Sequence, residues 1–356
     1  MRRNSSRAGL CILFATTIAF GSACREETSS GADDLAGLDL IGVDLTGFPA
    51  GDMSGPIVLQ STSAVTVIVE PGDNGDMLVA AINAATTSVH MTMYQLTSSR
   101  VTNALKARKA AGKDVKVVLN KTFPGGMGSN ASVYAELMAA GVAVAYAPSS
   151  FTYTHEKALI IDGAAAWIMT MNASEAAFNG NREFIAIDTD PADVAETEAI
   201  FQADFSGTAI TPTGKLLTAP VNAQERLIAL LDQATTTVDL EGEVLSASTI
   251  LEALGRAKKR GCTVRVVISD QTPTSAGASA IAALKQVSIP VRSVSTPYIH
   301  SKAIVADGKL AYIGSENFTA NSLENNRELG VLVGTQSEVT KIATTIAADF
   351  AAGTDL

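Results

Sequence analysis

The chain carries one nine-residue pattern twice, as HEKALIIDG at residues 155–163 and as HSKAIVADG at residues 300–308. Each copy begins with His-x-Lys, continues through aliphatic residues and ends in Asp-Gly. Because side chains two apart on a strand share a face, we expect the histidine and the lysine of each copy to project together. An Asp-Gly pair favours a tight turn into a returning strand. The sequence therefore predicts, in two places, a β-hairpin that starts at a histidine and a lysine.

Two further polar residues follow each copy at the same spacing. An asparagine stands ten residues after each motif aspartate, at Asn172 and Asn317, and a glutamate stands eleven residues after each asparagine, at Glu183 and Glu328. Both glutamates close an identical Asn-Arg-Glu triplet. We expect the returning strands to bring the asparagines back beside the histidines and lysines.

These residue types suit chemistry at a phosphoryl group. An imidazole can act as a nucleophile or as a general acid or base near neutral pH, and ammonium and amide groups can hold anionic oxygens. A carboxylate on the far ring nitrogen would fix the tautomer of each imidazole, and Glu183 and Glu328 are the candidates. We interpret Asp162 and Asp307 as structural turn residues that support the site. The predicted catalytic residues are His155, Lys157, Asn172, Glu183, His300, Lys302, Asn317 and Glu328.

The motifs lie within a longer repeat that begins at residue 57. Residues 84–89 (AATTSV) are echoed by residues 233–238 (QATTTV), each after an apolar-periodic helix and before a strand. Strands separated by helices of this length indicate βαβ units and largely parallel pairing. We expect an α/β protein with two repeated α/β/α halves, residues 57–211 and 212–356. Each half should hold a mostly parallel mixed sheet flanked by helices.

The paired motifs resemble the signature of the phospholipase D superfamily, a duplicated His-x-Lys-x4-Asp with a Gly-Ser-x-Asn element after it. The resemblance covers residues 57–356. It implies two α/β halves packed about a pseudo-twofold axis as a monomer. It also implies a phosphodiesterase that works through a covalent phosphohistidine, without metal or other cofactor. By the same resemblance His155 would be the nucleophile and His300 the general acid, an order that the symmetric motifs do not themselves show.

The first half departs from this signature at one position. The second half has Gly314-Ser315-Glu316-Asn317, whereas the first has Met169-Thr170-Met171-Asn172. Thr170 keeps a hydroxyl at the place of Ser315, and we expect both hydroxyls to support the site. Met169 places a bulky side chain where the signature has glycine, so the shape of that side of the pocket is open.

Other candidate residues carry weaker signals. His90, the third histidine, has Asp239 as its repeat counterpart, and we interpret it as an ordinary strand residue, with a substrate role as the alternative. Phe151, Tyr153 and Tyr298 precede the motifs and either line a groove or pack. No His/Cys/Asp cluster has metal-ligand spacing and no glycine-rich nucleotide fingerprint occurs, so we predict no metal and no cofactor.

The amino-terminal residues indicate export. Residues 1–24 combine three arginines, an apolar stretch too short to span a bilayer and a small-residue run before Cys24. This resembles a bacterial lipoprotein signal with lipid on Cys24, although Gly21 stands where leucine is usual. We expect a membrane-anchored lipoprotein on the cell envelope, at the outer membrane or the periplasmic side, with ordinary secretion as the alternative. The acidic residues 25–56 are expected to form a flexible linker, with a partner-binding peptide as the alternative.

Composition and charge narrow the substrate. With 47% hydrophobic and 17% charged residues, the chain is neither disordered nor a disulfide-stapled mini-fold. Removal of residues 1–23 takes away three arginines and no acids, which changes the net charge from −10 to −13. This acidity favours a phospholipid substrate, hydrolysed or transferred to an alcohol, over nucleic acid. A nuclease-like phosphodiesterase is the alternative, kept open by the basic runs at residues 106–113 and 256–260. The third alternative is a binding protein without catalytic activity. The presence of His, Lys, Asn and Glu in both halves argues against it.

Overall fold

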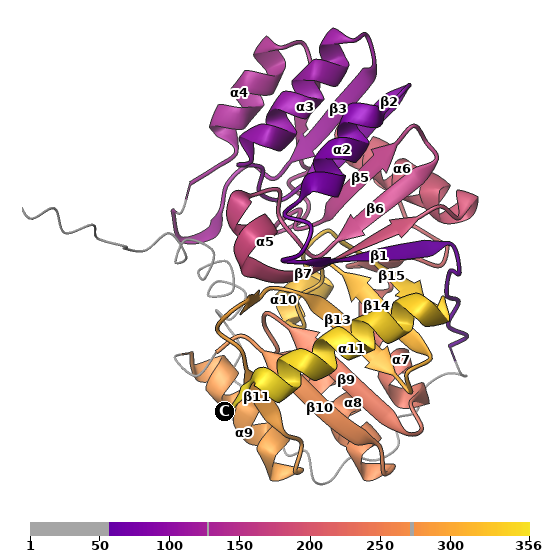
Figure 1. The fold of residues 1–356 in the computed structure, drawn as a ribbon, viewed down its shortest axis with the longest axis vertical. Coiled ribbons are helices and arrows are strands. Elements are labelled where there is room, and N and C mark those ends of the chain that lie inside the picture. Colours follow the sequence, from indigo (N-terminus) through magenta and orange to yellow (C-terminus); the bar gives the residue numbers. More distant parts are fainter. Residues whose placement is uncertain (1–56, 127, 271–273) are drawn as a thin grey trace, which may run out of the picture.

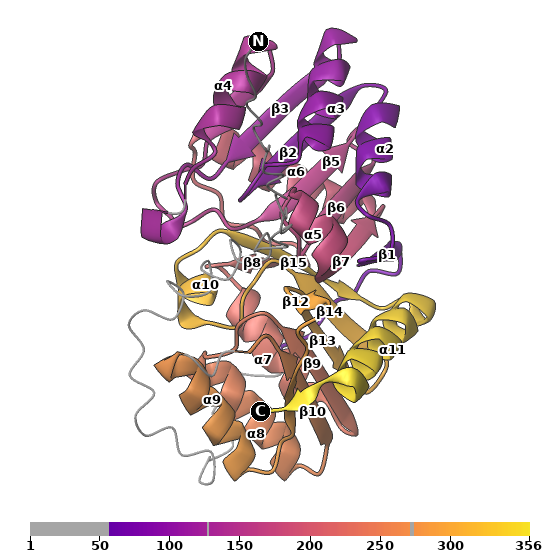
Figure 2. The ribbon, with the colours of Figure 1, turned by 60° about the vertical axis from the view of Figure 1, so that its left-hand side comes forward.

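The computed structural model describes residues 57–126, 128–270 and 274–356. The predicted signal, Cys24 and the whole predicted linker lie outside these residues. The described chain forms two α/β halves that stack one above the other (Figure 1). The same stacking is visible in the view turned by 60° (Figure 2).

The first half is built on an eight-stranded mixed sheet. Seven strands lie in the order β1 (Val65–Glu70), β7 (Asn181–Asp188), β6 (Ala165–Met169), β5 (Lys157–Ile161), β2 (Ser88–Met93), β3 (Asp114–Leu119) and β4 (Ala143–Tyr146). The eighth strand, β12 (Tyr298–Ile299), comes from the second half of the sequence and pairs with β7.

The second half repeats this plan. Its eight strands lie in the order β16 (Thr354–Asp355), β11 (Val291–Ser293), β10 (Thr263–Ile268), β9 (Thr237–Gly242), β13 (Lys302–Ala306), β14 (Leu310–Gly314), β15 (Glu328–Val333) and β8 (Leu217–Ala219). The central strands correspond one to one with those of the first sheet, as the sequence repeat predicts.

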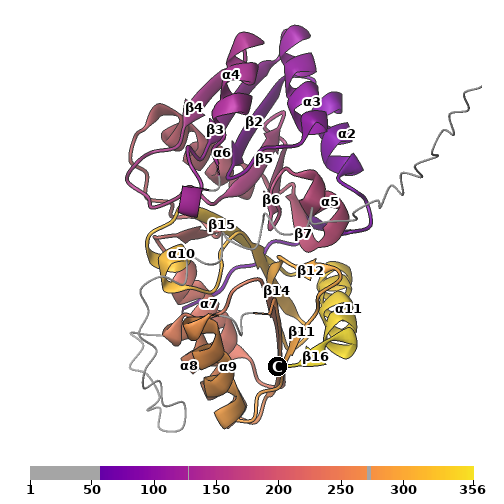
Figure 3. The same ribbon diagram turned by 90° about the vertical axis from the view of Figure 1, so that its left-hand side faces the viewer.

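Helices cover both sheets. The first half contains α2 (Asp76–Ala84), α3 (Ser99–Ala110), the 3₁₀ turn η1 (Pro124–Gly126), α4 (Ala131–Ala139), α5 (Glu175–Gly180) and α6 (Pro191–Ser206). The second half contains α7 (Ala223–Gln233), α8 (Ser248–Lys259), α9 (Ser275–Gln286), α10 (Ala320–Glu324) and α11 (Gln336–Ala352). In the second half α11 lies on one side of the sheet and α7, α8 and α9 lie on the other (Figure 3). The expected α/β halves with mixed sheets flanked by helices are confirmed.

Fewer neighbouring strands are parallel than the sequence predicts. Parallel pairing joins β2 to β3 and β3 to β4 in the first sheet, and β9 to β10 and β10 to β11 in the second. The remaining neighbours in the main strand order of each sheet are antiparallel. The Asp-Gly turns are one reason, because a short hairpin can connect only antiparallel strands.

A shared apolar core holds the halves together. Phe184 and Ala186 of β7 belong to the same buried cluster as Ala311 and Ile313 of β14. The intervening Ile185 faces the other way, into the core under α2 and α3. Successive side chains of a strand point to opposite faces of the sheet. One face of each sheet therefore packs against its own helices and, near the axis, the other face packs against the partner half.

Candidate active site

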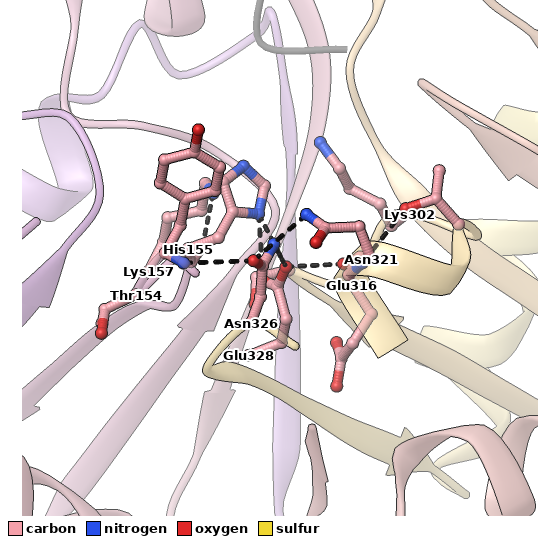
Figure 4. A network of polar contacts seen from close by, with 12 residues as sticks. Thr154, His155, Lys157, Lys302, Glu316, Asn321, Asn326 and Glu328 are labelled. Carbon is pink, nitrogen blue, oxygen red and sulfur yellow. Dashed lines mark hydrogen bonds and ion pairs between the residues drawn. The ribbon is translucent and has the colours of Figure 1, made fainter. Parts of the chain in front are cut away.

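Two crossed histidine–glutamate pairs form the centre of the site. Nδ1 of His155 lies 3.0 Å from both carboxylate oxygens of Glu328. Nδ1 of His300 lies 2.6 Å from Oε1 of Glu183. Each imidazole is therefore bound by the glutamate of the opposite half. Figure 4 shows His155 and Lys157 of the first half meeting Asn326 and Glu328 of the second.

Backbone pairing between the halves produces this crossing. The N–H groups of His155 and Glu156 donate to the carbonyl of Arg327, at 2.9 and 3.0 Å. In the corresponding contact of the other half, β12 pairs with the start of β7, and the His300 N–H donates to the Arg182 carbonyl at 3.3 Å. Each histidine thus enters the site beside the Asn-Arg-Glu triplet of the other half.

Both motif lysines are buried beside their own histidines. Nζ of Lys157 donates to the His155 carbonyl at 2.6 Å, and Nζ of Lys302 donates to the His300 carbonyl at 2.5 Å. The strands begin at the lysines, so the histidines lie just before β5 and β13. Burial lowers the pKa of Lys157 to about 7, although Glu328 opposes this shift.

Hydroxyl and amide groups fix the two glutamates. Thr170 Oγ1 donates to Glu183 at 2.5 Å, so the threonine hydroxyl contacts one of the predicted catalytic residues. Ser315 Oγ, its counterpart, accepts the Leu329 N–H at 3.0 Å, next to Glu328. Asn181 and Asn326, the first residues of the triplets, donate to Glu183 and Glu328 at 3.3 and 3.2 Å. Ser322 Oγ of α10 donates to Glu328 at 2.6 Å, a contact that no sequence motif indicates.

The motif asparagines and aspartates lie where the hairpins predict. Asn172 and Asn317 are buried just past β6 and β14, at the edge where β5 and β13 begin. Asp162 and Asp307 adopt positive φ with the following glycines, and their carboxylates accept backbone N–H groups of residues 86–88 and 235–237. The aspartates thus tie each hairpin to the start of the neighbouring strand.

Met169 and Gly314, which occupy equivalent positions in the two halves, have different surroundings. The Met169 side chain is fully buried in the apolar core of the first half. A Cβ at Gly314 would collide instead with Tyr312 Oη and Glu316 Oε2. Glycine is therefore needed at 314 because of the Tyr312–Glu316 pair, for which the first half has Trp167 and Met171.

The pKa values of the two histidines are shifted in opposite directions. Burial, together with the positive charges of Lys157 and Lys302, lowers the pKa of His155 well below its ordinary value. Burial also opposes protonation of His300, but Glu183 and Glu243 outweigh it and raise that pKa. His300 and Lys302 likewise hold the pKa of Glu183 below its ordinary value despite burial, whereas burial raises that of Glu328 to about 7. The surroundings thus favour the neutral form of His155 and the protonated form of His300.

Sequence reasoning missed two residues of the site, Glu243 and Tyr94. Glu243 Oε2 lies 3.1 Å from Lys302 Nζ and 3.4 Å from His300 Nε2. The Tyr94 ring meets that of His155 edge-on at 4.6 Å, and its centroid lies 5.0 Å from Lys157 Nζ. Each residue directly follows a repeated strand, β2 or β9, but the residue type differs between the two halves, so no repeated motif marks either position.

The remaining candidates lie around or outside this centre. His90 stacks on Phe201 of α6, and its ring nitrogens lie 2.8 Å from Glu198 and 3.2 Å from Asp114. Tyr298 Oη donates to Glu243 at 3.4 Å, and Phe151 lies under the Arg327 guanidinium.

Two further features concern metal binding and membrane crossing. Within residues 57–126, 128–270 and 274–356, no group of three or more His, Cys, Asp or Glu side chains is arranged to hold a metal ion. In the same part of the chain, no helix has the length and apolarity needed to cross a membrane.

Comparison with known proteins points to one family. The family model described as "Cardiolipin synthase, PLD-like domain" matches residues 78–205 and 227–352. Human mitochondrial cardiolipin hydrolase is 31% identical over 155 residues, which are 43% of this chain and 61% of the human one. Phospholipase D of Rickettsia typhi is 29% identical over 120 residues, 33% of this chain and 58% of that one. The chain thus spans about three fifths of the length of these relatives.

A solved structure repeats the fold over both halves. Phosphatidylserine synthase of Haemophilus influenzae superposes with a TM-score of 0.65 at 11% identity, covering 84% of this chain and 89% of that one. At this identity the likeness concerns the fold alone.

Proposed function

The chain belongs to the family of phospholipase D-like (PLD-like) domains, and from that premise we propose that it is a phosphodiesterase that cleaves a phospholipid through a phosphohistidine. The observation that carries the proposal is the crossed pairing of His155 with Glu328 and of His300 with Glu183. It orients Nε2 of each imidazole toward the centre of the site, and the surrounding charges lower the pKa of His155 and raise that of His300.

In the first step His155 attacks phosphorus. Glu328 accepts a hydrogen bond from the Nδ1–H group of the neutral ring, so the lone pair of His155 is on Nε2. As the N–P bond forms, the bond from phosphorus to the leaving oxygen breaks. The imidazolium of His300 gives its Nε2 proton to that oxygen, and the leaving alcohol departs neutral.

In the second step a water or an alcohol attacks the phosphohistidine. His300, now neutral, takes the proton of the attacking oxygen, and the N–P bond breaks to return His155. The two steps use the same residues in opposite roles: His300 first donates and then accepts a proton, and the N–P bond first forms and then breaks. Hydrolysis and transfer to an alcohol differ only in the attacking oxygen.

The lysines and asparagines of both halves are the groups that would hold the phosphoryl oxygens. Lys157 and Lys302 bring two ammonium groups to the buried centre, and Asn172 and Asn317 bring two amides. Donors that are fixed before the reaction stabilise charge in a dry site more than they would in water. One phosphodiester charge suits this donor set.

The distribution of basic residues favours a lipid over nucleic acid. In the two basic runs, Lys106 pairs with Glu136, and Arg256 and Arg260 both pair with Asp232. These bases are therefore partly neutralised by neighbours, and the net charge of the whole chain is −10. Binding to nucleic acid draws on unpaired lysines and arginines that meet several phosphates.

A lipid anchor would bring the enzyme to such a substrate. We propose that residues 1–24 direct export and that Cys24 carries lipid, so that residues 25–56 tether the catalytic halves to the cell envelope. The support is the sequence pattern of arginines, apolar residues and small residues before the cysteine.

The test compares substrate classes on the full chain. Head-group release from mixed vesicles of phosphatidylcholine, phosphatidylethanolamine and phosphatidylglycerol is measured beside cleavage of single-stranded DNA at physiological salt. His155→Ala serves as the inactive control. We expect kcat/KM on vesicles to exceed that on DNA by about tenfold or more, because field repulsion opposes a polyanion. A kcat/KM on DNA that exceeds the value on vesicles by about tenfold or more would identify nucleic acid as the substrate instead of lipid.

A further inference from the structure

The duplicated site is asymmetric at one pair of equivalent positions. Tyr94 directly follows β2 and Glu243 directly follows β9, the corresponding strand of the second half. Tyr94 places an uncharged ring against His155 and Lys157. Glu243 places a carboxylate against His300 and Lys302. The two halves thus surround chemically identical motifs with different neighbours.

The Glu243 carboxylate is held within the buried centre. Its side chain is 1% exposed, and Oε2 lies 3.4 Å from His300 Nε2 and 3.1 Å from Lys302 Nζ. Burial alone would raise the pKa of this carboxyl, but His300 and Lys302 hold it at about 2. Glu243 is therefore ionised at every pH at which the enzyme is expected to work.

His300 consequently lies between two carboxylates. Glu183 binds Nδ1 at 2.6 Å, and Glu243 is close to Nε2, the nitrogen that faces the reaction. Nζ of Lys302, 3.3 Å from Nδ1, opposes protonation, but the two carboxylates outweigh it and favour the doubly protonated imidazole. The ring that can only donate a proton cannot attack phosphorus.

His155 has the opposite surroundings. Glu328 binds Nδ1, while the face of the ring meets the edge of Tyr94. An aromatic neighbour removes water without adding a negative charge. Burial and the cations of Lys157 and Lys302 outweigh the opposing effect of Glu243 on this ring, so they favour the neutral imidazole. This ring keeps a lone pair for attack.

We infer that Glu243 is a positioning residue that makes the pseudo-twofold site directional, by reserving His300 for proton donation and leaving the attack on phosphorus to His155. The inference rests on the proposed phosphohistidine function and deepens it, because it names the group that breaks the symmetry. Through the ion pair with Lys302, Glu243 also reduces the positive charge on the second side of the site.

The experiment compares wild type with Glu243→Gln, which keeps the shape and removes the charge. Glu241→Gln is the matched control, since Glu241 lies two residues earlier on β9, is equally buried and bonds to Ser301. The full chain reacts once with bis(4-nitrophenyl) phosphate and is quenched in base. Mass spectrometry then locates the adduct on His155 or His300. The pH dependence of kcat/KM is measured on the mixed phospholipid vesicles.

We expect the wild type and Glu241→Gln to carry the adduct on His155. In Glu243→Gln the alkaline limb of kcat/KM should move down by about one pH unit, and the adduct on His300 should rise about tenfold, because each pKa unit changes the neutral fraction tenfold. A merely structural role of Glu243 would move neither quantity. An unchanged limb and an unchanged adduct, with His155 modified throughout, would overturn the role of Glu243 alone.

Two further outcomes are informative. A wild-type adduct on His300 would overturn the inference but not the covalent route, whereas no adduct on either histidine during turnover would overturn the proposed function. If Glu243→Gln does not fold, NMR of ¹⁵N-histidine-labelled wild type decides the matter. We expect His300 to carry two ring protons at neutral pH and His155 one, and a neutral His300 would contradict the inference.

Discussion

Alanine replacements at the residue scale should separate the tasks of the two histidines. His155→Ala removes the nucleophile and should abolish turnover of phospholipid and of bis(4-nitrophenyl) phosphate alike. His300→Ala removes the acid, which should cost about 10²- to 10⁴-fold in kcat/KM on phospholipid but less than about tenfold on the aryl ester, whose leaving group needs no proton. Steady-state kinetics on both substrates check this. Equal losses on both substrates in His300→Ala would argue against its role as the acid.

The same asymmetry predicts a pH profile. His155 must be neutral, and its pKa lies well below the ordinary value of 6.5, so titration of this ring should not limit activity as the pH falls through 6.5. Protonation of Glu328, whose pKa is about 7, should instead cause the decline on the acid side. His300 must be protonated, and its pKa lies above 6.5, so activity should also persist as the pH rises through that value. Lys157, with a pKa of about 7, adds to the loss at alkaline pH. We expect kcat/KM on vesicles to form a bell that includes pH 6.5, and a minimum there would contradict the protonation states.

At this scale the sequence predicts most residues of the site, but it does not predict which of them bind each other. The spacing of the motifs predicts which histidines, lysines and glutamates belong together. It cannot decide which glutamate binds which histidine, because that depends on how the Arg327 carbonyl meets the His155 N–H across the interface. Glu243 belongs to no motif, and only the packing of β9 against β13 shows that it reaches His300.

At the element scale, each Asn-Arg-Glu triplet also anchors a helix of the other half. Arg182 at the start of β7 pairs with Asp349 of α11, and Arg327 before β15 pairs with Asp204 of α6. Arg327→Met should lower the free energy of unfolding by about 3–5 kcal/mol, because it leaves Asp204 buried without its cation. The exposed Arg100, paired with Asp76, is the control, and its replacement should cost less than about 1 kcal/mol. Urea unfolding measures both, and equal costs would refute the anchoring role.

The elements themselves show what local sequence can and cannot specify. The Asp-Gly pairs predict the β5–β6 and β13–β14 hairpins, since both residues adopt the positive φ that such turns need. The alternation of strands and helices, in contrast, led us to expect too many parallel pairs, because the partner of an edge strand is set by tertiary packing. β1, for example, pairs antiparallel with β7, far along the chain.

At the scale of the whole molecule, the chain's own groups are expected to supply every part of the reaction. Imidazoles serve as nucleophile and acid, while lysines and asparagines hold the charge. We predict that excess EDTA leaves kcat/KM on vesicles unchanged within about twofold, since removing a required ion would cost far more. Loss on chelation, with recovery when one divalent ion is added back, would contradict this prediction.

The central claim is that both halves act in turn on one phosphorus, through a covalent intermediate on His155. The most direct measurement is the stereochemical course at phosphorus, with a phosphodiester made chiral by oxygen isotopes and converted to product by the full chain. Each in-line displacement inverts the configuration, so attack by His155 followed by attack of water or alcohol predicts net retention. Net inversion would mean a single direct displacement and would contradict the account.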